Sequence, residues 1–362
     1  MGRIIGISLS VVVLVIGVAF VGAFGAHAVA RQQTADEIAI RAPNGIDEER
    51  FVRIAGIDQW ITIRGQDRSN PVLLVLHGGP GSPESYLVRQ FLPLERHFVV
   101  VQWDQRGSGK TLGRAGGPVD PNLDIATMVR DGIAVSEYLR QHLHRNKIVV
   151  LGQSWGAILG VKMAQARPDL YAAFVGTGMA VCSQDERQSW QYAYLQARAK
   201  AVGDAKGLAE LKLAGPPPWP DESDNMKHMV QAAGPYLPPA LSYDDNVRAV
   251  LTAPHWSLSD VMALQRGIGG IRQTVLWREV LDMDFAHFGE TFAMPVVIVQ
   301  GELDLTTPTE FARAWLGRAK APAKALAVIQ GQGHEVLSYD NAAFAEALYA
   351  HLTPLLSSNP AS

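Results

Sequence analysis

The residues that first suggest chemistry are Gly152, Ser154 and Gly156, which form a G-x-S-x-G pattern within the stretch IVVLGQSWGAILG. The apolar residues before Gly152 predict a buried strand, and the residues after Ser154 predict a helix. A serine on such a sharp turn holds its hydroxyl at the carboxyl edge of the sheet, where the positive end of the helix favours a developing oxyanion. Ser154 is therefore the candidate nucleophile, although a structural turn could also place a serine there.

A serine nucleophile needs a base, and the base needs an acid that orients it. In proteins with this kind of turn, the chain order is serine, then aspartate or glutamate, then histidine, each after a later strand. The segment GELD offers Asp304, with Glu302 as the close alternative, and GQGHEV offers His334. We predict the catalytic triad Ser154, Asp304 and His334. His77 precedes the nucleophile and is interpreted as a buried hydrogen-bonding residue.

An oxyanion needs two hydrogen-bond donors. One is expected to be the backbone N–H of Trp155, which follows the nucleophile. The other is expected from the turn HGGPG at residues 77–81, where glycines allow the backbone to approach a substrate, and we assign it to Gly79. An ordinary tight turn would use the same glycines, so this assignment depends on the position of the turn relative to Ser154.

Composition limits the classes of protein to consider. The 362 residues are 48% hydrophobic and 19% charged, which is enough apolar material for a large core. The formal net charge of −3 gives no basic face for nucleic acid, so no nucleic-acid partner is expected. The single cysteine, Cys182, cannot form an internal disulfide, and we interpret it as packed rather than as a nucleophilic thiol.

Cofactors are not expected from the motifs. The sequence has no CxxC pair or Cys/His cluster that would indicate a metal site. The segment GSGKT at residues 107–111 resembles the end of a phosphate-binding loop, but Asp104 stands where the first glycine is required and Lys110 does not open an obvious helix. We therefore predict neither a nucleotide nor a metal.

Strand-like and helix-like segments alternate along two parts of the chain. This alternation predicts an α/β class, with a doubly wound and mostly parallel sheet. The alternation of strands and helices is interrupted at residues 183–292, where helix-like stretches predict an inserted helical cap. The predicted divisions are a membrane anchor or signal segment at 1–31, a linker at 32–50, a first core part at 51–182, the cap at 183–292 and a second core part at 293–355.

The amino terminus predicts a membrane segment. No charged residue occurs from Ile4 to Ala30, and about 20 apolar residues suffice for a helix to span a bilayer. The small residues of Ala26-His27-Ala28 also fit a signal-peptidase site. We expect a single-span anchor with an extracytoplasmic catalytic domain, and the alternative is export after signal cleavage.

The motifs HGGPG, WDQRGSGKT, GQSWG, GELD and GQGH together resemble the proline iminopeptidase family of α/β hydrolases. The resemblance implies an α/β-hydrolase fold with a helical cap, and metal-free removal of amino-terminal residues, often proline, from short peptides. It implies the same triad, Ser154, Asp304 and His334, with oxyanion donors at Gly79 and Trp155. It also implies that the DQRGSG loop braces the site, for which Asp104 and Arg106 would form a buried pair.

Substrate recognition is less defined by the sequence. An aminopeptidase must bind a free ammonium group, and the resemblance implies that cap carboxylates do so. The candidates are Glu186, Glu210, Glu222 and Glu279, and no cap motif selects one of them. The alternative enzyme is a carboxylesterase for small or lipid-like esters, with an apolar cap. A non-catalytic binding protein on the same scaffold is the alternative from another class.

Overall fold

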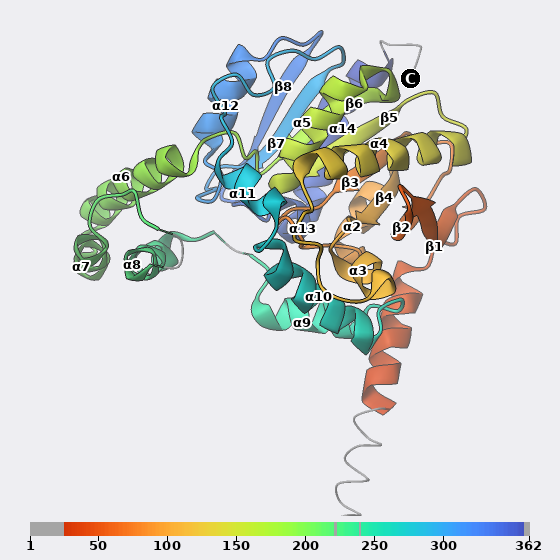
Figure 1. Cartoon of the computed structure of the whole chain (residues 1–362), viewed down its shortest axis with the longest axis horizontal. Coiled ribbons are helices and arrows are strands. Elements are labelled where there is room, and N and C mark those ends of the chain that lie inside the picture. Colours follow the sequence, from red (N-terminus) through yellow and green to blue (C-terminus); the bar gives the residue numbers. More distant parts are fainter. Residues whose placement is uncertain (1–24, 221–222, 239, 358–362) are drawn as a thin grey trace, which may run out of the picture.

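The computed structural model describes residues 25–220, 223–238 and 240–357 (Figure 1). In these residues a single eight-stranded sheet forms the centre of the molecule, with the strand order β1-β2-β4-β3-β5-β6-β7-β8. The strands are β1 (Ile46–Ile54), β2 (Ile57–Gly65), β3 (Val72–Leu76), β4 (Val99–Asp104), β5 (Ile148–Gln153), β6 (Tyr171–Thr177), β7 (Val296–Gly301) and β8 (Lys324–Ile329).

From β4 to β8 every neighbouring pair of strands is parallel, whereas β1 and β2 form an antiparallel hairpin that joins the sheet at β4. The central strands β3 and β5 are buried along their whole length. Such strands are covered on both faces, which is why they read as continuous apolar runs in the sequence. The predicted α/β class, with a doubly wound and mostly parallel sheet, is confirmed.

Successive residues of β3 and β5 point alternately into two hydrophobic cores, one on each face of the sheet. Leu74 and Val150 face a core that contains residues of α4 (Ile125–His142), α5 (Trp155–Ala166) and α12 (Thr309–Arg318). Their neighbours Leu73 and Val149 face the opposite core, with residues of α2 (Val88–Glu95) and α14 (Asn341–Ser357). Each fully buried aliphatic side chain contributes about 1.5–3 kcal/mol, so the helices on both faces fix the sheet firmly.

The helices between β6 and β7 fall into two groups. The first group is α6 (Gln184–Val202), α7 (Ala205–Ala214) and α8 (Asp224–Ala233). It encloses a small core around Leu195, Leu211 and Trp219, to which Leu305 from the segment after β7 also contributes. The second group is α9 (Tyr243–Thr252), α10 (Leu258–Ile271) and α11 (Val275–Leu281), and α10 packs against α3 (Gly109–Ala115). Figure 1 shows the first group projecting to the left of the sheet and α9 and α10 lying below it.

The short elements that complete the fold are the 3-10 helices η1 (Pro168–Leu170) and η2 (Gly234–Tyr236), and the helix α13 (Val336–Tyr339). Because α6 begins at Gln184 and β7 begins at Val296, the helical insertion occupies nearly the predicted residues 183–292. Its independence as a domain stays a prediction.

The predicted membrane segment is contradicted. Among residues 25–220, 223–238 and 240–357, no helix combines the length and the apolar character that crossing a bilayer requires. Residues 1–24 of the predicted anchor lie outside the described residues. The expected single-span anchor with an extracytoplasmic catalytic domain, and its alternative of export after signal cleavage, therefore lose their support.

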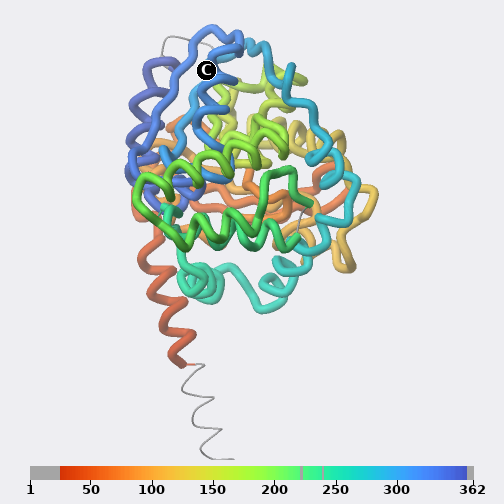
Figure 2. Tube along the Cα trace, turned by 90° about the vertical axis from the view of Figure 1, so that its left-hand side faces the viewer, coloured from red at the N-terminus to blue at the C-terminus, as the bar shows by residue number. Residues whose placement is uncertain are grey.

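Residues 25–38 form a helix that packs against the protein (Figure 2). Arg31 donates to the carbonyl of Pro254, and His27 bonds the carbonyl of Leu251 at 2.9 Å. Ile38 at the end of this helix is buried. The predicted linker at 32–50 thus contains the end of a helix and, from Ile46, the start of β1.

Candidate active site

Ser154 occupies the sharp turn between β5 and α5 with φ 54° and ψ −118°. A side chain in this backbone region costs about 1–3 kcal/mol, and such strain is often found at functional sites. The two glycines permit the turn by leaving room for other backbone. A Cβ atom on Gly156 would lie 1.9 Å from the carbonyl oxygen of Leu76, and one on Gly152 would lie 2.2 Å from the carbonyl oxygen of Gly156.

Asp304 and His334 are in contact, as their order in the sequence predicted. Oδ2 of Asp304 lies 3.0 Å from Nδ1 of His334. When Nδ1 carries the proton, the imidazole donates to the carboxylate and Nε2 remains available as a base. Burial opposes the protonated imidazole, but the neighbouring Asp304 carboxylate outweighs burial and holds the pKa of His334 above its usual value.

Asp304 is itself held in place by hydrogen bonds from the loop that follows it. The backbone N–H groups of Thr306 and Thr307 donate to Oδ1 of Asp304 at 2.9 and 2.8 Å, and the Thr307 hydroxyl donates to Oδ2 at 2.8 Å. The same hydroxyl lies 3.1 Å from Nδ1 of His334. Sequence reasoning missed this role of Thr307, which lies just before Pro308, the N-cap of α12, and orients the acid.

Glu302, the alternative acid, is exposed and accepts a hydrogen bond from the backbone N–H of Gly331 at 3.0 Å. Gly178, which follows β6, lies against the other side of the histidine. A Cβ atom on Gly178 would lie 2.7 Å from Cε1 of His334. The imidazole is therefore confined between Asp304 and the backbone at Gly178.

The HGGPG turn lies beside the nucleophile. A Cβ atom on Gly78 would lie 3.3 Å from Cβ of Ser154, and Gly79 has φ +110°. Trp155 begins α5 directly after Ser154, and its indole N–H donates to Oε1 of Gln105 at 3.0 Å. Gly79 lines the same pocket as Ser154, and Trp155 is its neighbour in the chain, but the role of their backbone N–H groups as oxyanion donors stays a prediction.

His77 is buried under this turn. Burial lowers its pKa to about 4, so the ring is neutral at pH 7. Its Nε2 lies 3.3 Å from the backbone N–H of Gln105, and the side-chain amide of Gln105 donates back to the carbonyl oxygen of His77 at 3.2 Å. These contacts agree with the interpretation of His77 as a hydrogen-bonding residue that supports the turn.

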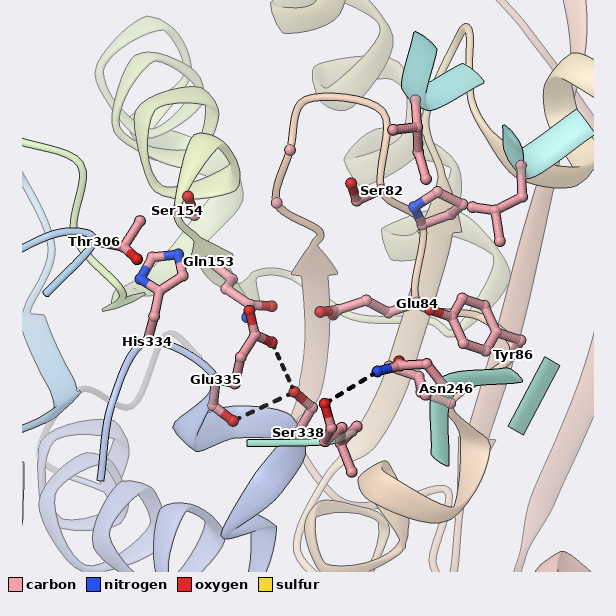
Figure 3. Close-up of a pocket in the computed structure, with 17 residues that line it drawn as sticks. Ser82, Glu84, Tyr86, Gln153, Ser154, Asn246, Thr306, His334, Glu335 and Ser338 are labelled. Carbon is pink, nitrogen blue, oxygen red and sulfur yellow. Dashed lines mark hydrogen bonds between the residues drawn. The ribbon is translucent and has the colours of Figure 1, made fainter. Parts of the chain in front are cut away.

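A pocket of about 510 Å³ opens at Ser154 (Figure 3). Ser154 and His334 line it together, although no hydrogen bond joins them among the described residues, a gap common in ligand-free active sites. The core contributes polar side chains to its wall, and the cap contributes mainly apolar ones. The lining side chains include Glu84, Gln153 and Glu335 from the core, and Leu241, Asn246, Leu264 and Ile268 from the cap segment.

The predicted cap carboxylates do not line this pocket. Glu186 caps its own helix through Ser183, Glu210 bonds His228 at 2.7 Å, and Glu279 accepts from the backbone N–H of Ile125 at 2.7 Å. Each therefore has a local structural partner, a fact that the sequence could not reveal. Glu222 lies outside the described residues.

Two further expectations concern the DQRGSG loop. Arg106 does not pair with Asp104; it forms two hydrogen bonds with Asp131 on α4, at 2.7 and 3.1 Å. Asp104 instead accepts from the backbone N–H of Lys110 at 2.8 Å. Lys110 does lie in a short helix, α3, contrary to expectation, and its ammonium lies 4.2 Å from the centre of the Trp60 ring.

Cys182 is partly buried, and burial raises the pKa of its thiol to about 12. A thiol with so high a pKa is a poor nucleophile at neutral pH. Within the described ranges, no group of three or more His, Cys, Asp or Glu side chains could hold a metal ion.

Comparison with known proteins assigns the chain to a family of enzymes. Residues 72–347 match the Alpha/beta hydrolase family, and the chain belongs to that family. The protein is therefore a hydrolase of the α/β fold, and its resemblance to proline iminopeptidases is confirmed by the relatives found.

Among these relatives, a probable aminopeptidase of Bacillus subtilis, YbaC, is 27% identical over 309 residues, which cover 82% of this chain and 94% of the relative. A probable proline iminopeptidase of Streptomyces coelicolor is 38% identical over 127 residues, covering 35% of this chain and 38% of the relative. The crystal structure of a proline iminopeptidase-related protein from Thermus thermophilus shares the fold, with a TM-score of 0.58 and 21% identity over 88% of this chain and all of that one.

Proposed function

We propose that this hydrolase is a serine enzyme that acts through an acyl-enzyme and releases amino-terminal residues from small peptides. The observation that carries the proposal is the strained turn at Ser154, which opens into the same pocket as the Asp304–His334 pair. The printed names of the relatives, a probable aminopeptidase and proline iminopeptidases, support the choice of substrate.

In the proposed reaction, Oγ of Ser154 attacks the carbonyl carbon of the first peptide bond while His334 takes the hydroxyl proton. The backbone N–H groups of Gly79 and Trp155 stabilise the oxyanion. His334 then gives its proton to the leaving amine as the C–N bond breaks. Water hydrolyses the acyl-enzyme by the same route, and Asp304 keeps the imidazole oriented throughout.

A second candidate is a carboxylesterase that uses the same residues. The observation in its favour is the cap side of the pocket, where Leu241, Leu264 and Ile268 present apolar side chains and none of the described cap carboxylates is found. An ester with a short acyl chain would fit such a surface without a charged anchor.

The test compares the full-length protein with Ser154→Ala on prolyl anilide, N-acetylprolyl anilide and p-nitrophenyl butyrate. We expect Ser154→Ala to lose at least about 10³-fold in kcat on every substrate that the wild-type protein cleaves. Cleavage of prolyl anilide but not its acetylated form identifies an aminopeptidase, whereas cleavage of the ester alone identifies the carboxylesterase. Retained turnover in Ser154→Ala contradicts the mechanism.

A further inference from the structure

Glu84 lies in the loop between β3 and α2 and lines the pocket that holds Ser154. Its backbone is fixed, because its carbonyl oxygen accepts hydrogen bonds from the backbone N–H of Leu87 at 2.8 Å and from the side-chain amide of Gln102 at 3.0 Å. Figure 3 shows the side chain extending from this anchored loop toward Gln153 and Glu335. The carboxylate is thus held at one place in the pocket wall.

The only neighbour that bonds this carboxylate in the described residues is neutral. With its nitrogen turned toward Glu84, the amide of Gln153 lies 2.6 and 3.2 Å from the two carboxylate oxygens. No lysine, arginine or histidine forms an ion pair with Glu84 in the part of the chain that the structure describes. An enclosed carboxylate without a cation is unfavourable, and a bound cation would relieve this cost.

The surroundings of Glu84 disfavour its ionised form unless a cation is nearby. Burial and the Glu335 carboxylate raise the pKa of Glu84 to about 8, against a smaller opposing effect of His334. Glu335 follows the histidine in the chain and stands at the exposed rim of the same pocket, where the Ser338 hydroxyl donates to it at 3.2 Å. Without a cation the Glu84 carboxyl group is therefore largely protonated at neutral pH, and a bound ammonium group would favour its ionised form.

The position of Glu84 also suits a particular substrate. In an amino acid the nitrogen and the carbonyl carbon are both bonded to Cα, so they lie about 2.5 Å apart. A group that binds the ammonium must therefore stand close to the nucleophile. Glu84 lines the same pocket as Ser154, and its hydrogen-bond partner, Gln153, immediately precedes Ser154 in the chain.

We infer that Glu84, assisted by Glu335, binds the free ammonium group of the substrate's first residue. The inference rests on the proposed function and makes it more specific: the amine is recognised by the core of the protein, not by the cap. The cap then contributes the apolar surface of Leu241, Leu264 and Ile268, on which a small apolar side chain or a proline ring can pack.

The test uses the full-length protein with Glu84→Gln, which keeps the size of the side chain and removes its charge. The exposed Glu310 on α12 supplies a matched control, Glu310→Gln. The measured quantity is the ratio of kcat/KM for prolyl anilide to kcat/KM for p-nitrophenyl butyrate. We expect the ratio to fall at least tenfold in Glu84→Gln, chiefly through KM, and to stay unchanged in Glu310→Gln. An unchanged ratio in Glu84→Gln overturns the inference.

A measurement on the wild-type protein covers the case in which Glu84→Gln does not fold, or prolyl anilide is not cleaved. Prolinamide, a cation at neutral pH, is compared with neutral N-acetylprolinamide as an inhibitor of butyrate hydrolysis. We expect the inhibition constant of prolinamide to be at least tenfold lower, and equal constants overturn the inference.

Hydrolysis of p-nitrophenyl butyrate distinguishes a failure of the inference about Glu84 from a failure of the proposed serine mechanism. Butyrate hydrolysis that depends on Ser154 supports the serine mechanism whatever happens at Glu84. If the wild-type protein cleaves none of the substrates, or Ser154→Ala retains activity, the proposed function fails and the inference about Glu84 fails with it.

Discussion

The two sides of the pocket differ in how their charged groups are partnered. On one side, the Asp304 carboxylate receives three hydrogen bonds from Thr306 and Thr307 and a contact from His334. On the other side, Glu84 has the neutral amide of Gln153 as its partner. A carboxylate with all its donors supplied by the protein can orient a neighbour, whereas one that lacks a cation is prepared for a charged ligand.

The largest loss of activity is expected from a change at Asp304, the carboxylate whose donors the protein supplies. Asp304→Asn removes the charge that stabilises the protonated His334, and we expect kcat to fall about 10²- to 10⁴-fold with the fold preserved. Glu302→Gln is the matched control, because Glu302 was the alternative acid and bonds Gly331 instead. Steady-state kinetics on p-nitrophenyl butyrate measure both, and equal losses in the two variants would contradict the assignment of Asp304.

The turn that presents Ser154 is expected to be equally intolerant of added atoms. In Gly156→Ala the new Cβ would meet the Leu76 carbonyl oxygen, so we expect a loss of about 3 kcal/mol or more in the free energy of unfolding. Gly317→Ala, at an exposed position of α12 with open space around it, should instead gain up to about 1 kcal/mol. Urea denaturation gives both values; a stable Gly156→Ala protein would refute the close approach.

A smaller loss is expected where the backbone confines the histidine. Gly178→Ala would place a Cβ 2.7 Å from His334, and we expect the displaced ring to lower kcat about tenfold. Gly331→Ala introduces an alanine at a similar positive φ but with no atom within 4 Å. If kcat in the two variants falls alike, backbone strain rather than contact with the imidazole is responsible.

The smallest effect is a shift in the pH dependence of ester hydrolysis. His334 must be neutral to act as a base, and its pKa is raised by Asp304 and, to a lesser degree, by Glu335. Activity should therefore rise with pH, with the midpoint of the acid limb above the usual histidine value of about 6.5. Glu335→Gln should move that midpoint downward by less than Asp304→Asn does. A midpoint that does not respond to either change would show that another group controls the limb.

The sequence was informative where a local constraint is visible in the residue types. Gly152 and Gly156 are required by contacts within one turn, and Asp304 and His334 follow strands whose carboxyl ends meet at one edge of the sheet. The order of strands and helices was predictable for the same reason, since buried parallel strands form continuous apolar runs.

The remaining features depend on contacts between distant segments. Glu84 lies in a loop without a periodic pattern, and only the packing of that loop against β5 brings it to Gln153. The cap glutamates were indistinguishable because each partner, such as Ser183 or His228, is fixed by the folded cap. At the amino terminus, hydrophobicity alone suggested a membrane span, whereas residues 25–38 include Arg31, which bonds the loop after α9.

Two side-chain contacts link the amino-terminal helix to the region of α9. Through His27 and Arg31 the helix holds the carbonyl groups of Leu251 and Pro254, at the end of α9. Asn246, on the same helix α9, lines the pocket. One helix, α9, thus joins the two ends of this arrangement, because it meets residues 25–38 at its carboxyl end and supplies Asn246 to the wall of the substrate pocket near its amino end.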